Sequence, residues 1–240
     1  MRALLFFLSL LSLPLLGRAD ARLHIAVASN FEPAARALVA NFEAEHEGVS
    51  IALSSASSGT HFHQIQHGAP FAIFFSADQR YPEALSQNPS YGEVYTYALG
   101  QLVLASRSPF EYAHAMDSIK NTTARLAIAN PNTAPYGRAA AEVLQASAVT
   151  GTTIQGQSVG QTFGFLKSGA VDFAFVARSQ VVAQPTIYWQ LAPNNYSPIE
   201  QAAILLKPKD ELAQAFWSYL QSHPAQAIIR SFGYEVILND

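Results

Sequence analysis

The sequence predicts an α/β protein of two lobes, each a sheet flanked by helices, with a ligand cleft between them. Short apolar segments alternate with helix-like segments along the chain, a pattern typical of parallel sheets. Two long extended segments, residues 95–106 and 198–206, interrupt this alternation and are predicted to cross between the lobes. The first lobe then comprises residues 22–99 and 200–240, and the second comprises residues 100–199 with a crossing segment at either end. A cleft of this kind is a natural ligand site that can close by hinge motion.

The chain begins with a predicted secretory signal peptide. Residues 3–16 are apolar, Arg2 precedes them, and an Ala-x-Ala cleavage site ends at Ala21. The apolar run is too short to span a bilayer comfortably. Cleavage after about Ala21 removes two arginines and one aspartate, so basic residues fall from 14 to 12, acidic residues from 17 to 16, and the net charge goes from −3 to −4. This mild acidity argues against a nucleic-acid binder.

No cysteine occurs in the sequence. The chain therefore offers no disulfide framework, no thiolate metal site and no cysteine near the signal peptide that could carry a lipid. A protein exported without an anchor needs an outer compartment to retain it. We therefore expect a periplasmic protein.

Hydrophobic periodicity predicts the elements of the first lobe. Residues 23–28 are apolar and partly β-branched, as in a buried strand. In residues 31–45 apolar side chains recur every three or four positions and predict a helix. The same reasoning predicts the strands 49–54 and 71–76, the helix 60–67, a helix opened by Ala77 and Asp78, and the late helices 210–221 and 224–232.

The second lobe is predicted to repeat the alternation. Its expected strands are residues 124–129, 154–158 and 172–176. Helices are expected at residues 138–146 and 159–167. A turn-rich stretch over residues 130–137 follows the first of these strands.

Polar residues follow the first two strands of the predicted first lobe. Ser29 and Asn30 end one strand, and the stretch SSASSGT over residues 54–60 follows the other. Ligands bind at the carboxyl ends of strands in parallel sheets, and a helix N-terminus aims free N–H groups at an anion. Because no lysine or arginine lies in the stretch, an anion would be held by dipoles and hydrogen bonds. The alternative is an ordinary helix N-cap after a flexible loop.

Six stretches, taken together, resemble one family. They are VASNF (27–31), SSASSG (54–59), GAPFAIFFSADQ (68–79), ANPNTAPYG (129–137), SVGQ (158–161) and FVARSQV (175–181). They occur in family order and span nearly the whole mature chain. The sequence thus resembles the periplasmic molybdate-binding proteins that feed ABC transporters.

The resemblance implies a type II periplasmic-binding-protein fold and a site for molybdate or tungstate. The implied donors are Ser29, Asn30 and Ser58 in the first lobe and the backbone N–H groups of Tyr136 and Val159 in the second. Some family members use a late tyrosine, but that position falls on Ala177 here, so a tyrosyl donor is excluded. The molybdenum or tungsten would be bound as its oxyanion, with no direct cation ligand, no cofactor and no catalytic residue.

The resemblance also implies the partners of the protein. A monomer would deliver the oxyanion to an ABC permease in the inner membrane. The sequence contains no P-loop motif, so the energy would come from a separate ATPase.

An enzyme is the main rival interpretation. Residues 156–160 read GQSVG, which matches the G-x-S-x-G nucleophile elbow of α/β hydrolases. Asp172 and His223 follow Ser158 in the order of a Ser-Asp-His triad. However, the strand before this motif is weak and no HGG-type oxyanion stretch precedes it, so Ser158 is interpreted as a helix N-cap.

Divalent metal binding is a second rival. His61, His63 and His67 lie in one short predicted helix, and two of them are four residues apart. No carboxylate accompanies them there, so a solvated helix face is the preferred interpretation.

Three side chains near the predicted site receive structural roles. Asp78 is expected to cap the helix after the third strand. The ring of Tyr136 is expected to form a wall of the cleft. Glu32 is expected to point away from the cleft, since a carboxylate would repel an anion.

Overall fold

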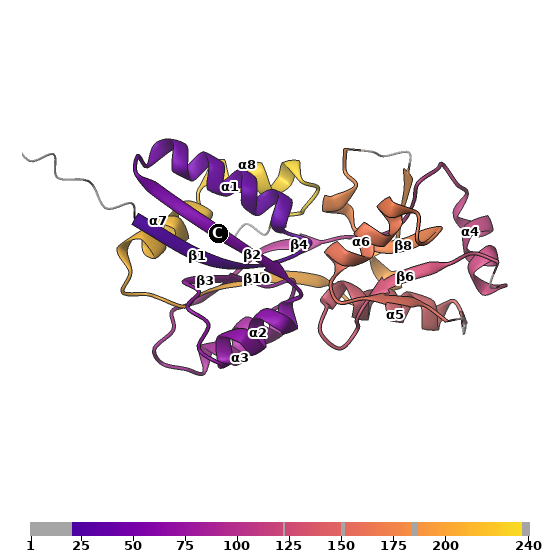
Figure 1. The fold of residues 1–240 in the computed structure, drawn as a ribbon, viewed down its shortest axis with the longest axis horizontal. Helices are drawn as coiled ribbons and strands as arrows, with labels where there is room; N and C mark the ends of the chain where they lie inside the picture. Colours follow the sequence, from indigo (N-terminus) through magenta and orange to yellow (C-terminus); the bar gives the residue numbers. More distant parts are fainter. Residues whose placement is uncertain (1–20, 122, 150–151, 184–186, 237–240) are drawn as a thin grey trace, which may run out of the picture.

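The computed structural model describes residues 21–121, 123–149, 152–183 and 187–236, which form two lobes side by side along the long axis of the molecule (Figure 1). Each lobe contains one five-stranded sheet with helices on its faces, so the predicted two-lobe α/β fold is confirmed. The predicted signal peptide lies outside the described residues, except that its last residue, Ala21, starts the first strand. Among the described residues, no helix has the length and apolar character needed to cross a membrane.

The first lobe contains the two ends of the described chain. Its strands are β1 (Ala21–Ala28), β2 (Val49–Ala56), β3 (Ile73–Phe75), β4 (Val94–Gly100) and β10 (Ile199–Leu205), in the spatial order β2-β1-β3-β10-β4. Its helices are α1 (Glu32–Glu45), α2 (Ser58–Gln66), α3 (Arg80–Ser86), α7 (Glu211–Leu220) and α8 (His223–Ser231).

Two layers of helices cover the first sheet. Helices α1, α7 and α8 lie on one face, and α2 and α3 lie on the other (Figure 1). The alternation of β1 supplies both faces, because Ile25 and Val27 pack under the first group of helices while Ala26 packs under the second. Because β1 pairs in parallel with β2 and with β3, the carboxyl ends of these three strands reach the same edge of the sheet.

The second lobe is built from the middle of the chain. Its strands are β5 (Leu102–Ser106), β6 (Leu126–Ala129), β7 (Ile154–Gly156), β8 (Phe173–Ala177) and β9 (Tyr188–Gln190), in the order β7-β6-β8-β5-β9. Its helices are α4 (Tyr112–Lys120), α5 (Pro135–Ala146) and α6 (Val159–Ser168), and the short 3-10 turns are η1 (Arg178–Gln180) and η3 (Pro193–Asn195). Helix α4 and strand β9 were not predicted from the sequence.

The crossing segments differ from a simple parallel arrangement. The predicted run over residues 95–106 divides at Gln101 into β4 in the first sheet and β5 in the second. On the return, β10 inserts between β3 and β4 and pairs antiparallel with both. Each sheet is therefore mixed, because strands that leave and re-enter a lobe must run in opposite directions. Sheet membership changes after Gly100 and again before Ile199.

Two helices begin earlier than the sequence indicated. Helix α2 starts at Ser58, two residues before the predicted start, and α5 starts at Pro135, three residues before it. Proline is well suited to the first turn of a helix, because its missing N–H has no partner to lose there. The early starts place Ser58 and Tyr136 in the first turns of their helices, where backbone N–H groups are free.

Candidate functional site

The strand registers bring polar turns of the two lobes to one place. In the first sheet Ala28 pairs with Ala56, so the turns after β1 and β2 leave the sheet side by side. In the second sheet Ala129 pairs with Gly156, so the turns after β6 and β7 also leave their sheet side by side. These four turns form the facing walls of the cleft between the lobes.

Two of the helices that start at these turns are capped by serine. The hydroxyl of Ser57 accepts a hydrogen bond from the N–H of Thr60 at 3.3 Å, at the start of α2. The hydroxyl of Ser158 accepts one from the N–H of Gln161 at 3.2 Å, at the start of α6. Because α5 also starts at the cleft, three helix N-termini surround it and make its potential favourable for an anion.

A small buried pocket lies where these turns meet. Its volume is about 10 Å³. It is lined by all five residues that the family resemblance implicated, Ser29, Asn30, Ser58, Tyr136 and Val159, together with Ala28, Ser57, Ala77, Ala134 and Pro135. The five implicated residues are at most 7% exposed. No side chain in this lining is charged, so an anion here would meet only neutral donors.

The pocket is rich in hydrogen-bond donors. Among the described residues, the backbone N–H groups of Asn30, Ser58, Tyr136 and Val159 have no hydrogen-bond partner. The hydroxyl oxygen of Ser58 accepts a hydrogen bond from the N–H of Ala77 at 2.9 Å, which leaves the hydroxyl hydrogen free to donate. The hydroxyl oxygen of Ser29 likewise accepts from the N–H of Gly160 at 3.0 Å. Four N–H and two O–H groups are thus available to one ligand.

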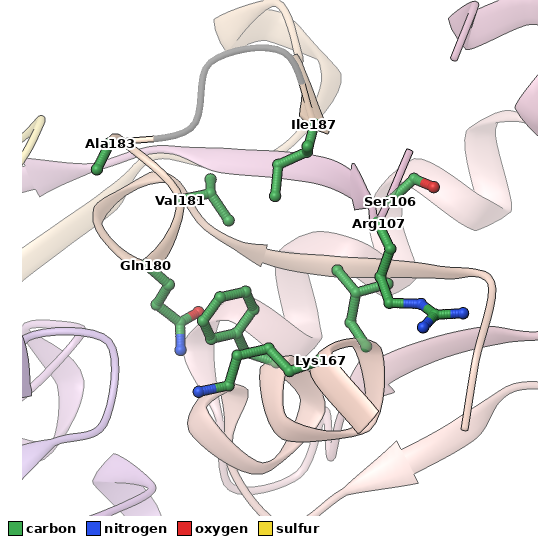
Figure 2. Close-up of a pocket in the computed structure, with 9 residues that line it drawn as sticks. Ser106, Arg107, Lys167, Gln180, Val181, Ala183 and Ile187 are labelled. Carbon is green, nitrogen blue, oxygen red and sulfur yellow. The ribbon is translucent and has the colours of Figure 1, made fainter. Parts of the chain in front are cut away.

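A wider pocket in the second lobe has a different character. It has a volume of about 520 Å³ and is walled largely by apolar side chains, including Phe163, Leu166 and Val181. Figure 2 shows that the side chains of Arg107 and Lys167 extend in different directions, so their charges do not converge on one ligand position. None of the five implicated residues lines this pocket.

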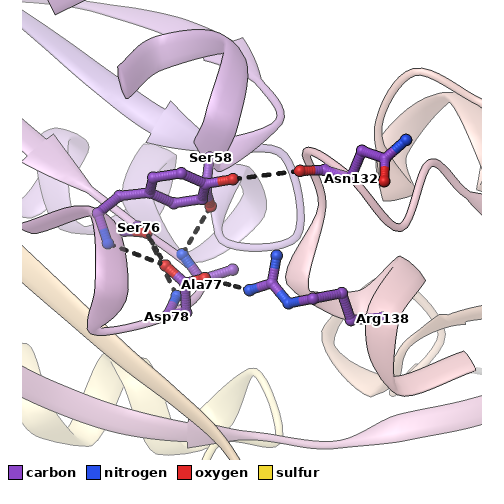
Figure 3. A network of polar contacts seen from close by, with 7 residues as sticks. Ser58, Ser76, Ala77, Asp78, Asn132 and Arg138 are labelled. Atoms are coloured by element: carbon purple, nitrogen blue, oxygen red, sulfur yellow. Dashed lines mark hydrogen bonds and ion pairs between the residues drawn. The ribbon is translucent and has the colours of Figure 1, made fainter. Parts of the chain in front are cut away.

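Polar contacts join the two lobes at one edge of the cleft (Figure 3). Asp78 forms an ion pair with Arg138 of the second lobe and accepts a hydrogen bond from the hydroxyl of Ser76 at 3.0 Å. The hydroxyl of Tyr81 donates to the carbonyl of Asn132 at 3.4 Å. The structure is therefore that of a closed cleft.

Asp78 has a role that the sequence did not reveal. It was expected to cap the helix after the third strand, and one of its oxygens does accept a long hydrogen bond, 3.5 Å, from the N–H of Tyr81. The other oxygen pairs with Arg138 across the cleft. One signal in the sequence could have revealed this pair. Asp78 follows the third predicted strand, and Arg138, of opposite charge, follows the turn-rich stretch of residues 130–137.

Two other side chains near the pocket can be placed. The phenol of Tyr136 does not wall an open cleft as expected. It is buried, and its oxygen accepts a hydrogen bond from the amide of Gln201 at 3.1 Å. Glu32 is absent from the pocket lining, and its carboxylate pairs with Arg36 one turn along α1. Although partial burial raises the pKa of Glu32, hydrogen bonds from Ser55 and Arg36 hold it below its usual value.

The proposed hydrolase triad does not assemble. Ser158 follows β7, at the cleft edge of the second sheet. Asp172 precedes β8, at the opposite edge of the same sheet, and pairs there with Arg125 at 3.1 Å. His223 begins α8 in the other lobe. Ser158 caps helix α6, as the alternative interpretation predicted. The hydrolase interpretation is not supported.

The two histidines of α2 and His67, which follows its end, are not equivalent, which corrects the expected solvated face. His63 and His67 are exposed, whereas His61 is fully buried. One ring nitrogen of His61 lies 3.2 Å from the carbonyl oxygen of Val27, and the other lies 3.0 Å from the side chain of Gln64. Within the described part of the chain, no group of three His, Cys, Asp or Glu residues is arranged to hold a metal ion.

The burial of His61 predicts a pH dependence of stability. Burial lowers the pKa of its imidazole, although the hydrogen bonds with Gln64 and Val27 act in the opposite direction. The unfolded chain then binds a proton more readily than the folded chain, so the contribution of His61 is complete above the unfolded pKa and is lost as pH falls from that value through the lower folded pKa. We expect the free energy of unfolding to decrease between about pH 7.5 and about pH 5.5. Urea unfolding at both pH values would measure it.

The test and control variants for this prediction replace two histidines of the same helix. The decrease should become smaller in His61→Gln and stay unchanged in His63→Gln, because His63 is exposed. An equal decrease in all three proteins would show that His61 does not cause it.

Comparisons with known proteins agree with the two-lobe fold described above. Residues 23–235 match the family model described as bacterial extracellular solute-binding protein. The molybdate-binding protein ModA of Azotobacter vinelandii is 36% identical over 228 residues, which cover 89% of this chain and 90% of that protein. ModA of Rhodobacter capsulatus is 37% identical over 218 residues, covering 87% and 86%.

A solved structure is similar over the same extent. The periplasmic molybdate-binding protein of Azotobacter vinelandii superimposes with a TM-score of 0.81 at 33% identity, covering 91% of this chain and 100% of that one. The residues matched by the family model, 23–235, include both lobes.

Proposed function

The chain belongs to the bacterial extracellular solute-binding protein family, and we propose that it captures molybdate between its lobes. The observation that carries this proposal is the pocket with six neutral donors and no charged side chain. The names of the two relatives above indicate the ligand, and the chemistry of the pocket agrees with it. A tetrahedral dianion accepts hydrogen bonds at every oxygen and donates none.

We infer that Ser29, Asn30, Ser58, Tyr136 and Val159 bind the oxyanion. The two serines would donate through their hydroxyls, and the N–H groups of Asn30, Ser58, Tyr136 and Val159 would donate from the backbone. Helix N-termini from both lobes would stabilise the negative charge without a counterion. A pocket of about 10 Å³ has room for roughly one water molecule, so the lobes must move apart for the oxyanion to enter and fit.

The donor set also supports discrimination among anions. Phosphate carries a proton near neutral pH, and in a pocket of donors alone that proton lacks an acceptor, at a cost of about 1–3 kcal/mol. Sulfate is a dianion but smaller, so discrimination against it would depend on the size of the pocket once the lobes have closed on a ligand. Tungstate matches molybdate in charge and shape, and we propose that it binds as well.

We further propose that the monomer acts in the periplasm and delivers the oxyanion to an ABC permease served by a separate ATPase. The predicted signal peptide and the relatives named above support this setting. The lobes would close on the ligand and open at the permease.

An anion panel tests the proposed ligand. We expect molybdate and tungstate to raise the melting temperature of the mature protein, whereas sulfate and phosphate leave it unchanged. At 100 times its dissociation constant a ligand contributes about 2.7 kcal/mol to the free energy of unfolding. Calorimetric titration of each anion would then give the affinities. Unchanged melting with all four anions, or a shift with sulfate alone, would contradict the proposal.

A further inference from the structure

A buried polar cluster lies directly behind the pocket and contains side chains of both lobes. We call it the rear cluster. Its members are Asn30, Tyr97 and Tyr234 from the first lobe, Gln201 from the crossing strand β10, and Tyr136 and Ser179 from the second lobe. Each is at most 6% exposed. Polar groups buried in this way are costly unless they are hydrogen-bonded, so the contacts among them determine what the cluster does.

Gln201 joins the two walls of the pocket. Its carbonyl oxygen accepts a hydrogen bond from the side-chain amide of Asn30 at 2.8 Å, and its own amide donates to the phenol oxygen of Tyr136 at 3.1 Å. The carbonyl oxygen also accepts from the hydroxyl of Tyr97 at 3.2 Å. One residue on a crossing strand thus contacts one implicated site residue from each lobe.

Tyr234 and Ser179 hold the other side of Asn30. The side-chain amide of Asn30 donates to the hydroxyl of Tyr234 at 3.0 Å, and that hydroxyl lies 2.9 Å from the backbone carbonyl oxygen of Asn30. The hydroxyl of Ser179 donates to the same carbonyl at 2.8 Å. Burial raises the pKa of the Tyr97, Tyr136 and Tyr234 phenols, so they remain neutral.

These contacts determine how Asn30 can serve the pocket. Both N–H bonds of its side-chain amide are engaged, one by Gln201 and one by Tyr234. Its backbone carbonyl oxygen is engaged by the hydroxyls of Ser179 and Tyr234. The backbone N–H, which has no partner among the described residues, is the donor left for a ligand. The rear cluster therefore holds the residue that carries this N–H, through its side chain and through the peptide unit that follows it.

We propose that Gln201 and Tyr234 are positioning residues for oxyanion binding, which orient Asn30 and couple its orientation to lobe closure. This inference rests on the proposed function. The coupling follows because Tyr136 and Ser179 belong to the second lobe and reach Gln201 and Asn30 only when the lobes are together. Loss of these contacts disfavours the closed state, and a ligand held by both lobes then leaves faster.

Two variants and a matched control test the proposal. Tyr234→Phe removes the hydroxyl but keeps the ring, which packs against Phe31 with the centroids 5.5 Å apart. Gln201→Met removes the hydrogen bonds to Asn30, Tyr136 and Tyr97 at similar volume. We expect each variant to bind molybdate roughly tenfold more weakly or worse, through faster dissociation at an unchanged association rate. The control is Tyr219→Phe, which removes a hydroxyl bonded to Asn41 at 2.6 Å, away from the site.

The readouts separate a positioning role from a structural one. A purely structural role would lower the melting temperature of the unliganded variants and leave the dissociation constant and the dissociation rate unchanged. Wild-type affinity in folded Tyr234→Phe and Gln201→Met, established by circular dichroism, would overturn the inference. Failure of the wild-type protein to bind any oxyanion would instead refute the proposed function.

Discussion

Replacing Gly59 with alanine is expected to weaken molybdate binding by up to about 10⁴-fold, the limit at which both second-lobe donors are lost. Gly59 lies in the first turn of α2, and its N–H donates to the carbonyl of Thr133 in the second lobe at 2.9 Å. A Cβ atom there would lie 2.8 Å from the hydroxyl oxygen of Tyr81 and 3.0 Å from the Thr133 backbone. The Tyr81 side chain and the Thr133 backbone would both have to withdraw, which moves the second-lobe donors away from the first-lobe wall.

The magnitude follows from the donors that are lost. The proposed second-lobe donors are the N–H groups of Tyr136 and Val159, and a hydrogen bond to a charged group contributes about 1.5–3 kcal/mol. Loss of both costs about 3–6 kcal/mol, and each 1.4 kcal/mol is about tenfold in affinity. Calorimetric titration would measure the loss, and small-angle scattering with molybdate would show whether the variant stays open.

Gly164→Ala is the matched control for this substitution. Gly164 lies within α6, and a Cβ atom there would meet no heavy atom within 4 Å. The exchange should leave the dissociation constant unchanged and stabilise the protein by about 0.5–1 kcal/mol, because alanine favours a helix over glycine. If Gly59→Ala also bound molybdate as tightly as the wild type, close approach at Gly59 would not be required for capture.

The Ser58→Ala variant is expected to bind molybdate about 10- to 150-fold more weakly while keeping its fold. It loses one hydroxyl donor to a charged ligand, worth about 1.5–3 kcal/mol. It also leaves the N–H of Ala77 without the acceptor that now lies 2.9 Å away.

Calorimetric titration and thermal unfolding would check the second prediction together. The control is Ser86→Ala, which removes an exposed hydroxyl bonded to the carbonyl of Glu83 in the same lobe. It should change neither the affinity nor the melting temperature appreciably. An unchanged dissociation constant in Ser58→Ala would remove Ser58 from the proposed donor set.

The turns around the pocket could be predicted because their signals are local. A short apolar strand, a serine or proline at the helix start and a run of small residues all lie within a few positions of one another. Pairing of Ala28 with Ala56 then brings the turns together, as expected for the carboxyl ends of parallel strands. The two-lobe fold followed from the same alternation and from the two long extended segments.

The remaining features depend on contacts between residues far apart in the chain. Asp78 and Arg138 are 60 positions apart, and Asn30 and Gln201 are 171 apart. No pattern in the neighbourhood of Gln201 or Tyr234 distinguishes these residues from ordinary strand or terminal residues. The burial of His61 was missed for a related reason, since its polar neighbours on α2 are exposed while the sheet beneath it is not.

The insertion of β10 between β3 and β4 has a consequence for the order of folding. All five strands of the second sheet lie between residues 102 and 190, so that lobe can fold as soon as this stretch has emerged. The first sheet cannot be completed then, because β4 joins it only through β10, which lies near the end of the chain. During synthesis, where the N-terminal part emerges first, we expect the lobe encoded second to be finished first. The cleft then comes into existence only when the last fifth of the polypeptide arrives.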